Sequence, residues 1–511
     1  MILLPEITNI YGLSMITFIV ALLVLVLGYV LYGKFVNSVF VPDGTRLTPS
    51  VTLADGVDYI SMPTWRVFLI QFLNIAGTGP IFGAILGILF GPAAYLWIVF
   101  GCIFAGAVHD YFTGMISLRS NGASIPEIVG DNLGGGARLL MRVLSLILLI
   151  LVGAVFARTP ANLISGLTPT DGFWGGALFW LIVIIVYYIL ATLLPIDKLI
   201  GRIYPLFGAA LLVMAVGVCW GILTQDGTLP EITEAFSNHY PTGKLPVFPC
   251  LCVTIACGAV SGFHATQSPL MARCLDNEKN GRLVFYGAMI TEGIVALIWA
   301  AGAIKFADSV CAAGATPYEK LLNLMTENGA HSADPALLVN AVCKSWLGSV
   351  GALLAVLGVV AAPITSGDTA FRSARLIASD FLHVKQEKIA SRLLLALPLF
   401  GVAICLFFID FQILWRYFAW FNQTLACVAL WAFTAWLARR DTAHKEVSYL
   451  VTLIPALWMT LVSTTYICIA PEGFTLPTNI SYAIGAVCTL TLLVVFIIWN
   501  RRIGKLMTKS L

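Results

Sequence analysis

Apolar stretches long enough to cross a membrane alternate with short polar segments along almost the whole chain. Between Val67 and His109 there is no Asp, Glu, Lys or Arg, which leaves room for two membrane-spanning helices with Gly91-Pro92 as the hinge. The predicted spans are 12–33, 66–90, 93–118, 138–157, 176–194, 203–223, 247–272, 283–304, 346–367, 390–409, 412–437, 447–468 and 479–500. We therefore expect an all-α polytopic membrane protein with about thirteen transmembrane helices.

The positions of the basic residues predict how these helices are oriented. Cytoplasmic loops of membrane proteins carry an excess of Lys and Arg. Alternate loops of this chain, beginning after the first predicted span, hold most of its 29 Lys and Arg residues. The amino terminus is therefore expected outside and the carboxyl terminus inside. Because no small-residue cleavage site follows the first span, we expect a retained helix and not a removed signal peptide.

Composition agrees with a membrane protein and excludes other classes. Apolar residues make up 59% of the 511 residues, charged residues make up 11%, and the mean hydropathy is +0.92. An ordinary soluble globular protein does not have these values. The net charge of +3 comes mainly from the basic loops on one side, so it does not indicate nucleic-acid binding.

Two predicted spans are interrupted near their middle by residues that favour irregular backbone. The second span contains Ile75-Ala-Gly-Thr-Gly-Pro80, and the seventh contains Cys257-Gly-Ala-Val-Ser-Gly-Phe-His264. Irregular backbone persists at membrane depth only where protein or a watery cavity satisfies its N–H and C=O groups. Paired interruptions are typical of the substrate site of a secondary transporter. The alternative is that these glycines only permit close packing of helices.

The two interrupted spans run in opposite directions through the membrane. Their separation by five spans predicts a LeuT-like core, an inverted repeat of five plus five helices, within a single transport domain, 1–511. The first predicted repeat covers 66–224 and the second covers 247–437. Residues 12–33 would form an additional helix at the front, and 447–500 would hold two additional helices at the back.

The interruptions supply the predicted substrate site. Gly77 and Gly79 permit unwinding, and Pro80 suits the first turn of a new half-helix because it has no N–H to satisfy. Free N–H groups at the start of that half-helix would hold a substrate carboxylate. The predicted substrate-binding residues are Gly77, Thr78, Gly79, Gly258, Ser261, Gly262 and His264 at the interruptions, with Gln71 and Asn74 on the helix face before the first one.

Ionisable residues at membrane depth predict the ion-coupling site. Glu292 lies near the centre of the eighth span, where a carboxylate persists only when it is protonated or paired. We expect Glu292 to carry the coupling proton, and a structural partner role is the alternative. Asp368 either binds an ion or caps its helix and pairs with Arg372 and Arg375. Asp110 either gates the cytoplasmic mouth or ends its helix.

Other polar residues have more than one interpretation. Thr365 and Ser366 either offer hydroxyls to a sodium ion beside the first interruption or bond back to their own helix. Asn422 and Gln423 are expected to join helices through hydrogen bonds. The stretch 371–384 mixes basic and apolar residues, which predicts a helix that lies on the membrane surface.

The cysteines do not indicate a cofactor or a metal site. Most of the 12 lie within predicted spans, where a thiol behaves as a small apolar group, and Cys250-Leu-Cys252 is predicted to pack in this way. We expect no cofactor other than the coupling ion, H⁺ or Na⁺. Cys311 and Cys343 lie in the long outer loop, where they either form a disulfide or remain free thiols.

Several motifs resemble the carbon starvation protein A (CstA) family. They are Asp43-Gly-Thr-Arg-Leu-Thr-Pro49, Asp55-Gly-Val-Asp-Tyr59, Ile75–Pro80, Ala105-Gly-Ala-Val-His-Asp110, Thr254–His264 and Asp368–Arg375. The resemblance implies a multi-pass transporter of the bacterial inner membrane, in the amino acid, polyamine and organocation superfamily, that takes up peptides or pyruvate when carbon is scarce. The chain departs from longer members at Ile70-Gln71, where those carry His-His or His-Gln.

We therefore expect a secondary active transporter. The expected substrate is a small carboxylate, either pyruvate or a short peptide or amino acid, imported by symport with H⁺ through alternating access. An enzyme is not expected, because no paired carboxylates and no nucleophile with its base stand at helical spacing. The alternatives are a Na⁺-coupled carrier and a membrane-embedded metabolite sensor or scaffold. The expected partners are the substrate and the lipid bilayer, without nucleic acid, and the exact substrate and oligomeric state stay open.

Overall fold

The computed structural model describes most of the chain. The described residues are 15–167, 173–193, 196–241, 243, 245–326, 335–386, 388–409, 411–444 and 447–507. Residues 12–14 of the first predicted span and residue 194 of the fifth lie outside them. Within the described residues the regular structure is helical, with an isolated β-bridge between Met62 and Leu275 and no strand.

Nine helices in the described part are long and apolar enough to cross a membrane. They are Ile16–Phe40, Ala93–Arg119, Gly135–Ser165, Tyr204–Thr224, Glu278–Val310, Ile389–Leu406, Ile413–Arg440, Leu450–Ile469 and Thr478–Arg502. The bent pair Thr64–Ile75 and Gly79–Phe90 passes the same test when it is taken as one span. The molecule is therefore an all-helical, multi-pass membrane protein, as the hydropathy pattern predicts.

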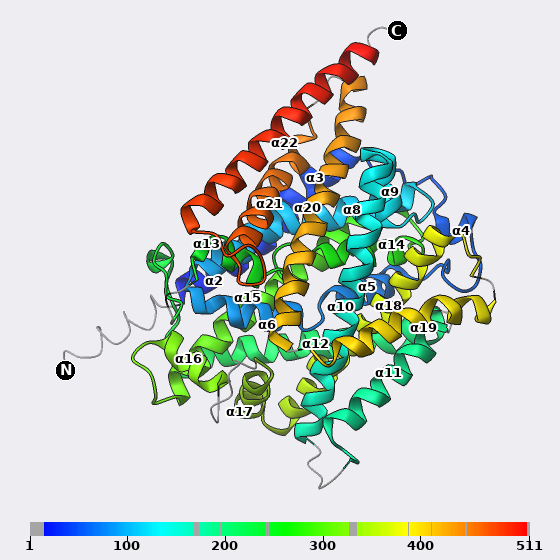
Figure 1. Ribbon diagram of the computed structural model, residues 1–511. Helices are drawn as coiled ribbons and strands as arrows, with labels where there is room; N and C mark the ends of the chain where they lie inside the picture. Colours follow the sequence, from blue (N-terminus) through cyan, green and yellow to red (C-terminus); the bar gives the residue numbers. More distant parts are fainter. Residues whose placement is uncertain are drawn as a thin grey trace.

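The helices follow one another with few long connections (Figure 1). The α-helices are α2 (Ile16–Leu27), α3 (Gly33–Phe40), α4 (Pro49–Thr52), α5 (Thr64–Ile75), α6 (Gly79–Gly87), α7 (Ala93–Leu96), α8 (Ala107–Arg119), α9 (Ile125–Leu133), α10 (Gly135–Leu167), α11 (Ala177–Leu193), α12 (Ile196–Thr224), α13 (Val247–Thr254), α14 (Gly262–Ala272), α15 (Ala288–Val310), α16 (Pro317–Met325), α17 (Pro335–Ala355), α18 (Ala361–Leu382), α19 (Ile389–Leu406), α20 (Phe411–His444), α21 (Leu450–Ile469) and α22 (Thr478–Met507). Short 3₁₀ segments are η2 (Ile88–Phe90), η4 (Ile232–Glu234) and η5 (Glu278–Asn280), and π-helical segments are η1 (Gly28–Tyr32), η3 (Trp97–Gly106), η6 (Arg282–Gly287) and η8 (Val356–Val360).

Three predicted spans coincide with neither a long apolar helix nor the bent pair. The span predicted at 176–194 coincides with the shorter apolar helix α11, and 247–272 is divided between α13 and α14. The span predicted at 346–367 lies across the end of α17, η8 and the start of α18. The other predicted spans each coincide with a long apolar helix or with the bent pair. The total of thirteen spans and the repeat boundaries stay predictions.

The helices differ strongly in how much protein surrounds them. In the helix Glu278–Val310, 83% of the apolar window is buried inside the protein, whereas the figure for Thr478–Arg502 is 17%. The first is therefore a central helix and the second a peripheral one. Figure 1 shows α22 at one edge of the molecule, next to α21, and α11 and α19 at the opposite edge. Between them, α10 packs along α18, and α20 packs along α21.

The surface-lying helix expected at 371–384 is a wrong prediction. Most of this stretch continues α18, and the side chains of Arg372 and Arg375 are fully buried. Asp58, in the segment before α5, lies 3.1 Å from Nη1 of Arg372 and 3.9 Å from Nη2 of Arg375. Burial alone would raise the pKa of Asp58, but the charges of these arginines and of Arg273 outweigh burial and lower its pKa below the ordinary value.

Candidate functional site

Both predicted interruptions are breaks in the helices. Residues 76–78 separate α5 from α6, the two helices are bent by 46°, and Pro80 lies in the first turn of α6. Residues 255–261 separate α13 from α14. Within this second break Gly258 has a φ of +90°, a left-handed conformation that favours glycine.

The two breaks lie against each other. A Cβ added at Gly79 would lie 2.5 Å from the Cβ and Sγ of Cys257. A Cβ added at Gly258 would lie 2.6 Å from the Cβ of Ala296 on α15 and 3.7 Å from the Cα of Pro80. Because a side chain at either glycine would collide with its neighbour, the absence of one is what brings the unwound segments together.

Buried polar atoms at the first break have no hydrogen-bond partner among the described residues. This holds for both polar side-chain atoms of Asn74, for the hydroxyl of Thr78 and for Oε1 of Gln71. Nε2 of Gln71 donates to Oγ of Ser268 at 3.1 Å. The side chains of Gln71, Asn74 and Thr78 are all completely buried. Since buried polar groups nearly always find a partner, these atoms are available to water or to a polar ligand.

Two amide side chains of α20 hold the second break. Oδ1 of Asn422 accepts hydrogen bonds from the hydroxyl of Ser261 at 3.1 Å and from the N–H of Phe263 at 2.6 Å. On the other side of the break, Nε2 of Gln423 donates to the carbonyl of Cys252 at 3.0 Å. The predicted helix-joining role of Asn422 and Gln423 is therefore confirmed.

Four ionisable side chains from α8, α14 and α15 form a buried series in which each lies next to the following one. Nδ1 of His109 lies 2.8 Å from Asp110 Oδ1, and Asp110 Oδ2 lies 2.8 Å from Nδ1 of His264. Nε2 of His264 lies 3.4 Å from Oε2 of Glu292. The other oxygen of Glu292 accepts the N–H of Gly258 at 3.1 Å. Asp110 lies inside the continuous helix of η3 and α8, so it does not end that helix.

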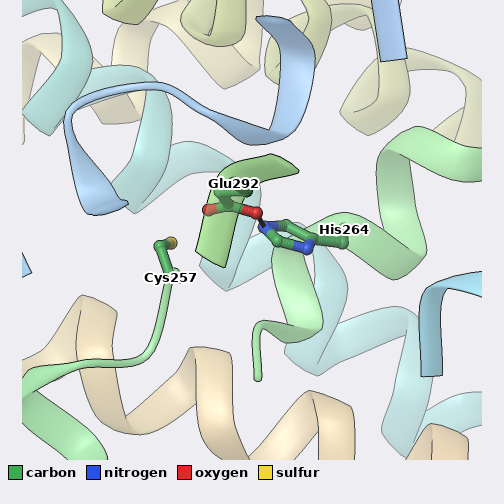
Figure 2. A group of neighbouring side chains, drawn as sticks. All are labelled: Cys257, His264 and Glu292. Atoms are coloured by element: carbon green, nitrogen blue, oxygen red, sulfur yellow. Dashed lines mark ion pairs between the residues drawn. The ribbon is translucent and has the colours of Figure 1, made fainter. Parts of the chain in front are cut away.

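His264 and Glu292, at one end of this series of ionisable side chains, lie beside the second break (Figure 2). Figure 2 shows His264 and Glu292 pointing toward each other, with Cys257 beside them on the unwound segment. One ligand atom from each lies within 4.8 Å of the others, a spacing that one metal ion can span. No sequence spacing marks this group, because its members come from α14, α15 and the break between α13 and α14.

Asp368 lies in a second buried acidic cluster, between α11, α12 and α18. Its Oδ2 accepts hydrogen bonds from the hydroxyls of Tyr204 and Tyr187, the latter at 3.4 Å. Its Oδ1 has no hydrogen-bond partner among the described residues. Asp368 sits within α18, and the arginines that follow it form their ion pairs with Asp58. Asp368 is therefore neither a helix cap nor the ion-pair partner of those arginines, and the alternative that assigned it these roles is wrong.

The hydroxyls next to Asp368 separate into two roles. Oγ of Ser366 donates to the carbonyl of Leu73 at 3.2 Å, in the last turn of α5 before the first break. A Cβ added at Gly77 would lie 3.0 Å from Oγ of Ser366. Oγ1 of Thr365 donates to the carbonyl of Ala362 at 2.7 Å, within its own helix. Thr365 therefore bonds back to α18, whereas Ser366 reaches the first break.

Two spaces of very different size lie beside the broken helices. A cavity of about 250 Å³ lies between α6, α13, α20 and α21, and its lining includes Phe82 and Thr254 from the halves that lead to the breaks. Arg416 also lines it, with Nε 3.1 Å from Oε2 of Glu472. At the other end, the space among α9, α14 and α18 measures about 10 Å³, hardly enough for one water.

Some members of these clusters were not predicted as functional. They are His109, Tyr187, Tyr204, Cys257 and Asp58. Their one visible signal is a polar group within or beside an apolar span, which many structural residues share. Cys311 and Cys343, whose pairing stayed open, are free thiols in this structure.

The overall architecture is that of known membrane transporters. A crystal structure of the manganese transporter of Eremococcus coleocola, in complex with an aromatic bis-isothiourea substituted compound, aligns with a TM-score of 0.54 over 89% of this chain and 99% of that chain. A histidine-to-alanine mutant of that transporter aligns with a TM-score of 0.53 and the same coverage. At 13% sequence identity this likeness shows the fold alone. The class of protein is therefore a multi-pass, all-helical membrane protein with transporter architecture.

Sequence comparison gives the family. The model of carbon starvation protein CstA matches residues 13–175 and 172–317. The chain belongs to this family, as the sequence motifs indicated. An uncharacterized membrane protein of Haemophilus influenzae is 46% identical over 344 residues, which are 58% of this chain and 93% of that protein.

Relatives with a named activity are more distant. The pyruvate/proton symporter BtsT of Escherichia coli is 29% identical over 315 residues, which are 50% of this chain and 44% of the symporter. The peptide transporter CstA of Campylobacter jejuni is 30% identical over 343 residues, which are 55% of this chain and 48% of the transporter. The matched region thus spans about half the length of these curated transporters.

Proposed function

We propose that the chain is a secondary active transporter that imports a small carboxylate, either pyruvate or a short peptide or amino acid, by symport with protons. The observation that carries this proposal is the meeting of two helix breaks, with buried unpartnered polar atoms on one and a carboxylate held by a backbone N–H on the other. The activities of the named relatives, pyruvate/proton symport and peptide transport, support this substrate class.

The substrate would bind at the first break. Asn74 and Thr78 offer an amide and a hydroxyl that no described residue uses. Thr78 is the N-cap of α6, where backbone N–H groups and the positive end of the helix dipole favour an anion, and Asn74 lies across the break in the last turn of α5. Across the contact, the Gly258 N–H already holds the carboxylate of Glu292, which supports the capacity of this backbone to bind carboxylates.

Glu292 would couple the proton to the substrate. Its protonation removes the negative charge that faces His264 and weakens the acceptor for the Gly258 N–H. Because Gly258 lies beside Pro80 in the first turn of α6, a change at Gly258 acts next to the substrate side. Asp110 extends the chain of ionisable groups away from the break, which offers the proton a path.

We assign this cluster to protons and not to a metal ion. Nδ1 of His264 is engaged by Asp110, and Oε1 of Glu292 is engaged by Gly258. The remaining atoms, His264 Nε2 and Glu292 Oε2, face each other at 3.4 Å, which is an ion-pair distance with no need for a third charge. The relative BtsT is a pyruvate/proton symporter, which supports coupling to protons.

The proposal includes a LeuT-like core of five plus five helices with the amino terminus outside. The breaks in α5–α6 and α13–α14 support the inverted repeat, and the distribution of Lys and Arg supports the orientation. In that orientation the 250 Å³ cavity faces outside and the tightly packed end faces the cytoplasm. The structure would then be an outward-facing stage of alternating access.

The test is uptake of labelled pyruvate, dipeptides and tripeptides into proteoliposomes that contain the full chain. An inward proton gradient should drive accumulation of one of these carboxylates, and a sodium gradient alone should not. Accumulation driven by sodium would reassign coupling to Na⁺ beside Ser366. Equilibrium binding without flux or counterflow would favour the sensor, and loss of uptake in EDTA with recovery in Mn²⁺ or Zn²⁺ would assign the Cys257 cluster to a metal.

Glu292→Gln tests the coupling residue. The amide keeps the size of the side chain but cannot exchange a proton, so proton-driven accumulation should fall while substrate exchange across the membrane continues. Glu234→Gln, at an exposed glutamate in η4, is the matched control and should behave as the unmodified protein. Unchanged concentrative uptake by Glu292→Gln would exclude this carboxylate from coupling.

A further inference from the structure

A long helix contacts each of the two breaks and also carries a buried carboxyl group, Glu292 on α15 and Asp368 on α18. Glu292 on α15 accepts the N–H of Gly258 in the second break. On α18, Ser366 donates to the carbonyl of Leu73 before the first break, and Asp368 follows it by two residues. Residues two apart on a helix face different sides, so Ser366 reaches the first break whereas Asp368 faces Tyr204 and Tyr187.

The surroundings of the two carboxyl groups differ in charge. Glu292 faces His264, so a cation is available to it inside the protein. Asp368 is met by tyrosines instead, namely Tyr204 from α12 and Tyr187 from α11, and forms no ion pair with a described residue within 4.0 Å. A fully buried carboxylate without a paired cation is unfavourable at membrane depth, and taking up a proton is the direct way to remove its charge.

The other groups around Asp368 do not replace that proton. Arg372, one turn further along α18, pairs with Asp58 at 3.1 Å and donates to the Ala191 carbonyl at 2.7 Å. The hydroxyl of Tyr188 on α11 donates to the carbonyl of Phe156. One oxygen of Asp368 has no described hydrogen-bond partner, so it has room to carry a hydrogen.

From this geometry we infer that Asp368 is a second proton-binding site and that two protons accompany each carboxylate. The inference rests on the proposed function, because it assigns the stoichiometry of the same symport. No described residue bonds to the side chains of both Asp368 and Glu292, so each can be protonated in its own step. A proton on Glu292 acts directly on the second break through Gly258, whereas a proton on Asp368 acts on α18, the helix whose Ser366 bonds to the last turn of α5.

Two protons and one proton differ in the charge that crosses the membrane. A monocarboxylate with one proton crosses as a neutral pair, whereas two protons carry one net positive charge inward. A membrane potential that is negative inside then drives uptake even without a pH gradient. A potential of about 59 mV should support about tenfold accumulation of a monocarboxylate. For a zwitterionic peptide each value rises by one charge, and the difference of one charge between the two stoichiometries remains.

The experiment sets the potential with valinomycin and K⁺ gradients in proteoliposomes at equal pH on both sides. Labelled pyruvate is the probe, and a dipeptide is the probe if the unmodified protein carries only peptides. The unmodified protein should accumulate pyruvate about tenfold per 59 mV. Asp368→Asn should still transport with a pH gradient but lose one unit of charge per substrate, so the potential alone should no longer accumulate pyruvate.

Two further variants keep the test decisive. Asp368→Glu retains a carboxyl group and should keep the response to potential, which covers the case in which Asp368→Asn does not fold. Asp226→Asn, at an exposed aspartate after α12, should match the unmodified protein. With a dipeptide as the probe, the expected accumulation per 59 mV is about hundredfold for the unmodified protein and about tenfold for Asp368→Asn. The inference is overturned if the potential drives no accumulation of pyruvate in a protein that takes up pyruvate, or if Asp368→Asn keeps the full response to potential with the probe used. The absence of uptake of every carboxylate under a pH gradient would instead overturn the proposed function.

Discussion

Gly262 is the position where a single methyl group should damage transport most directly. It begins α14, and a Cβ there would lie 2.3 Å from the carbonyl oxygen of Asn422 and 2.5 Å from the backbone N of Ala426. Both are backbone atoms of α20, so no side-chain rotation relieves the contact. Overpacking of this kind costs about 1–3 kcal/mol, and we expect the upper part of that range because a helix must move.

The expected result of Gly262→Ala follows from the bonds that share this contact. If α14 moves away from α20, the bonds from Ser261 and Phe263 to Asn422 lengthen, and the second break loses its fixed shape. A penalty of about 2 kcal/mol against the binding-competent arrangement lowers apparent affinity about 30-fold. The measurements are the KM of proton-driven uptake and the melting temperature of the purified protein in detergent.

Gly401→Ala is the matched control. Gly401 lies in α19, and a Cβ there would meet nothing within 4 Å. Because alanine is the better helix former, this change should stabilise by about 0.5–1 kcal/mol and leave the KM unaltered. If Gly262→Ala matches this control in both measurements, the close approach of α14 to α20 is refuted. If only its melting temperature falls, the break is a packing feature and not part of the substrate site.

Two remaining predictions concern the ends of the molecule. Asp58→Asn leaves Arg372 and Arg375 buried without their counter-charge, so unfolding free energy should fall by about 3–5 kcal/mol, measured as a lower melting temperature. Because the pKa of Asp58 is lowered, its contribution is complete above the ordinary value and is lost only as pH falls through the lower folded value. Stability should therefore be insensitive to this group from pH 8 to pH 5, and a decline in that range that disappears in Asp58→Asn would contradict the pairing. A membrane-impermeant maleimide should label half-buried Cys311 from outside without reductant and leave buried Cys343 unlabelled, whereas labelling that requires reductant would show that the two are paired.

The breaks were predictable because their cause is local. Gly77, Gly79 and Pro80 act on the backbone through their own covalent structure, and the same is true of Gly258 in its left-handed conformation. An interruption in an apolar stretch can therefore be located from the sequence. The need of Glu292 for a partner was predictable for a related reason, since a charged residue in the middle of an apolar span must have a partner or a proton.

The partners themselves could not be predicted, because they are set by packing between distant segments. Asp58 precedes α5, yet it neutralises arginines on α18, and this long-range pairing turned an expected surface helix into a buried one. Tyr187 and Tyr204 look like ordinary aromatic residues of two apolar helices until Asp368 is placed between them. Residues that meet only through tertiary structure leave no spacing in the sequence.

The unpartnered atoms of Asn74 and Thr78 have a consequence for selectivity. Buried polar groups that no protein atom satisfies are satisfied by water or by a solute, so an incoming solute competes with water for the same amide and hydroxyl. A solute that lacks complementary oxygens would expel the water and leave those groups unsatisfied, which is more unfavourable than leaving the site wet. Discrimination would then come from the unfavourable free energy of binding the wrong solute, and apolar molecules of the right size would be excluded although the 250 Å³ cavity has a mostly apolar lining.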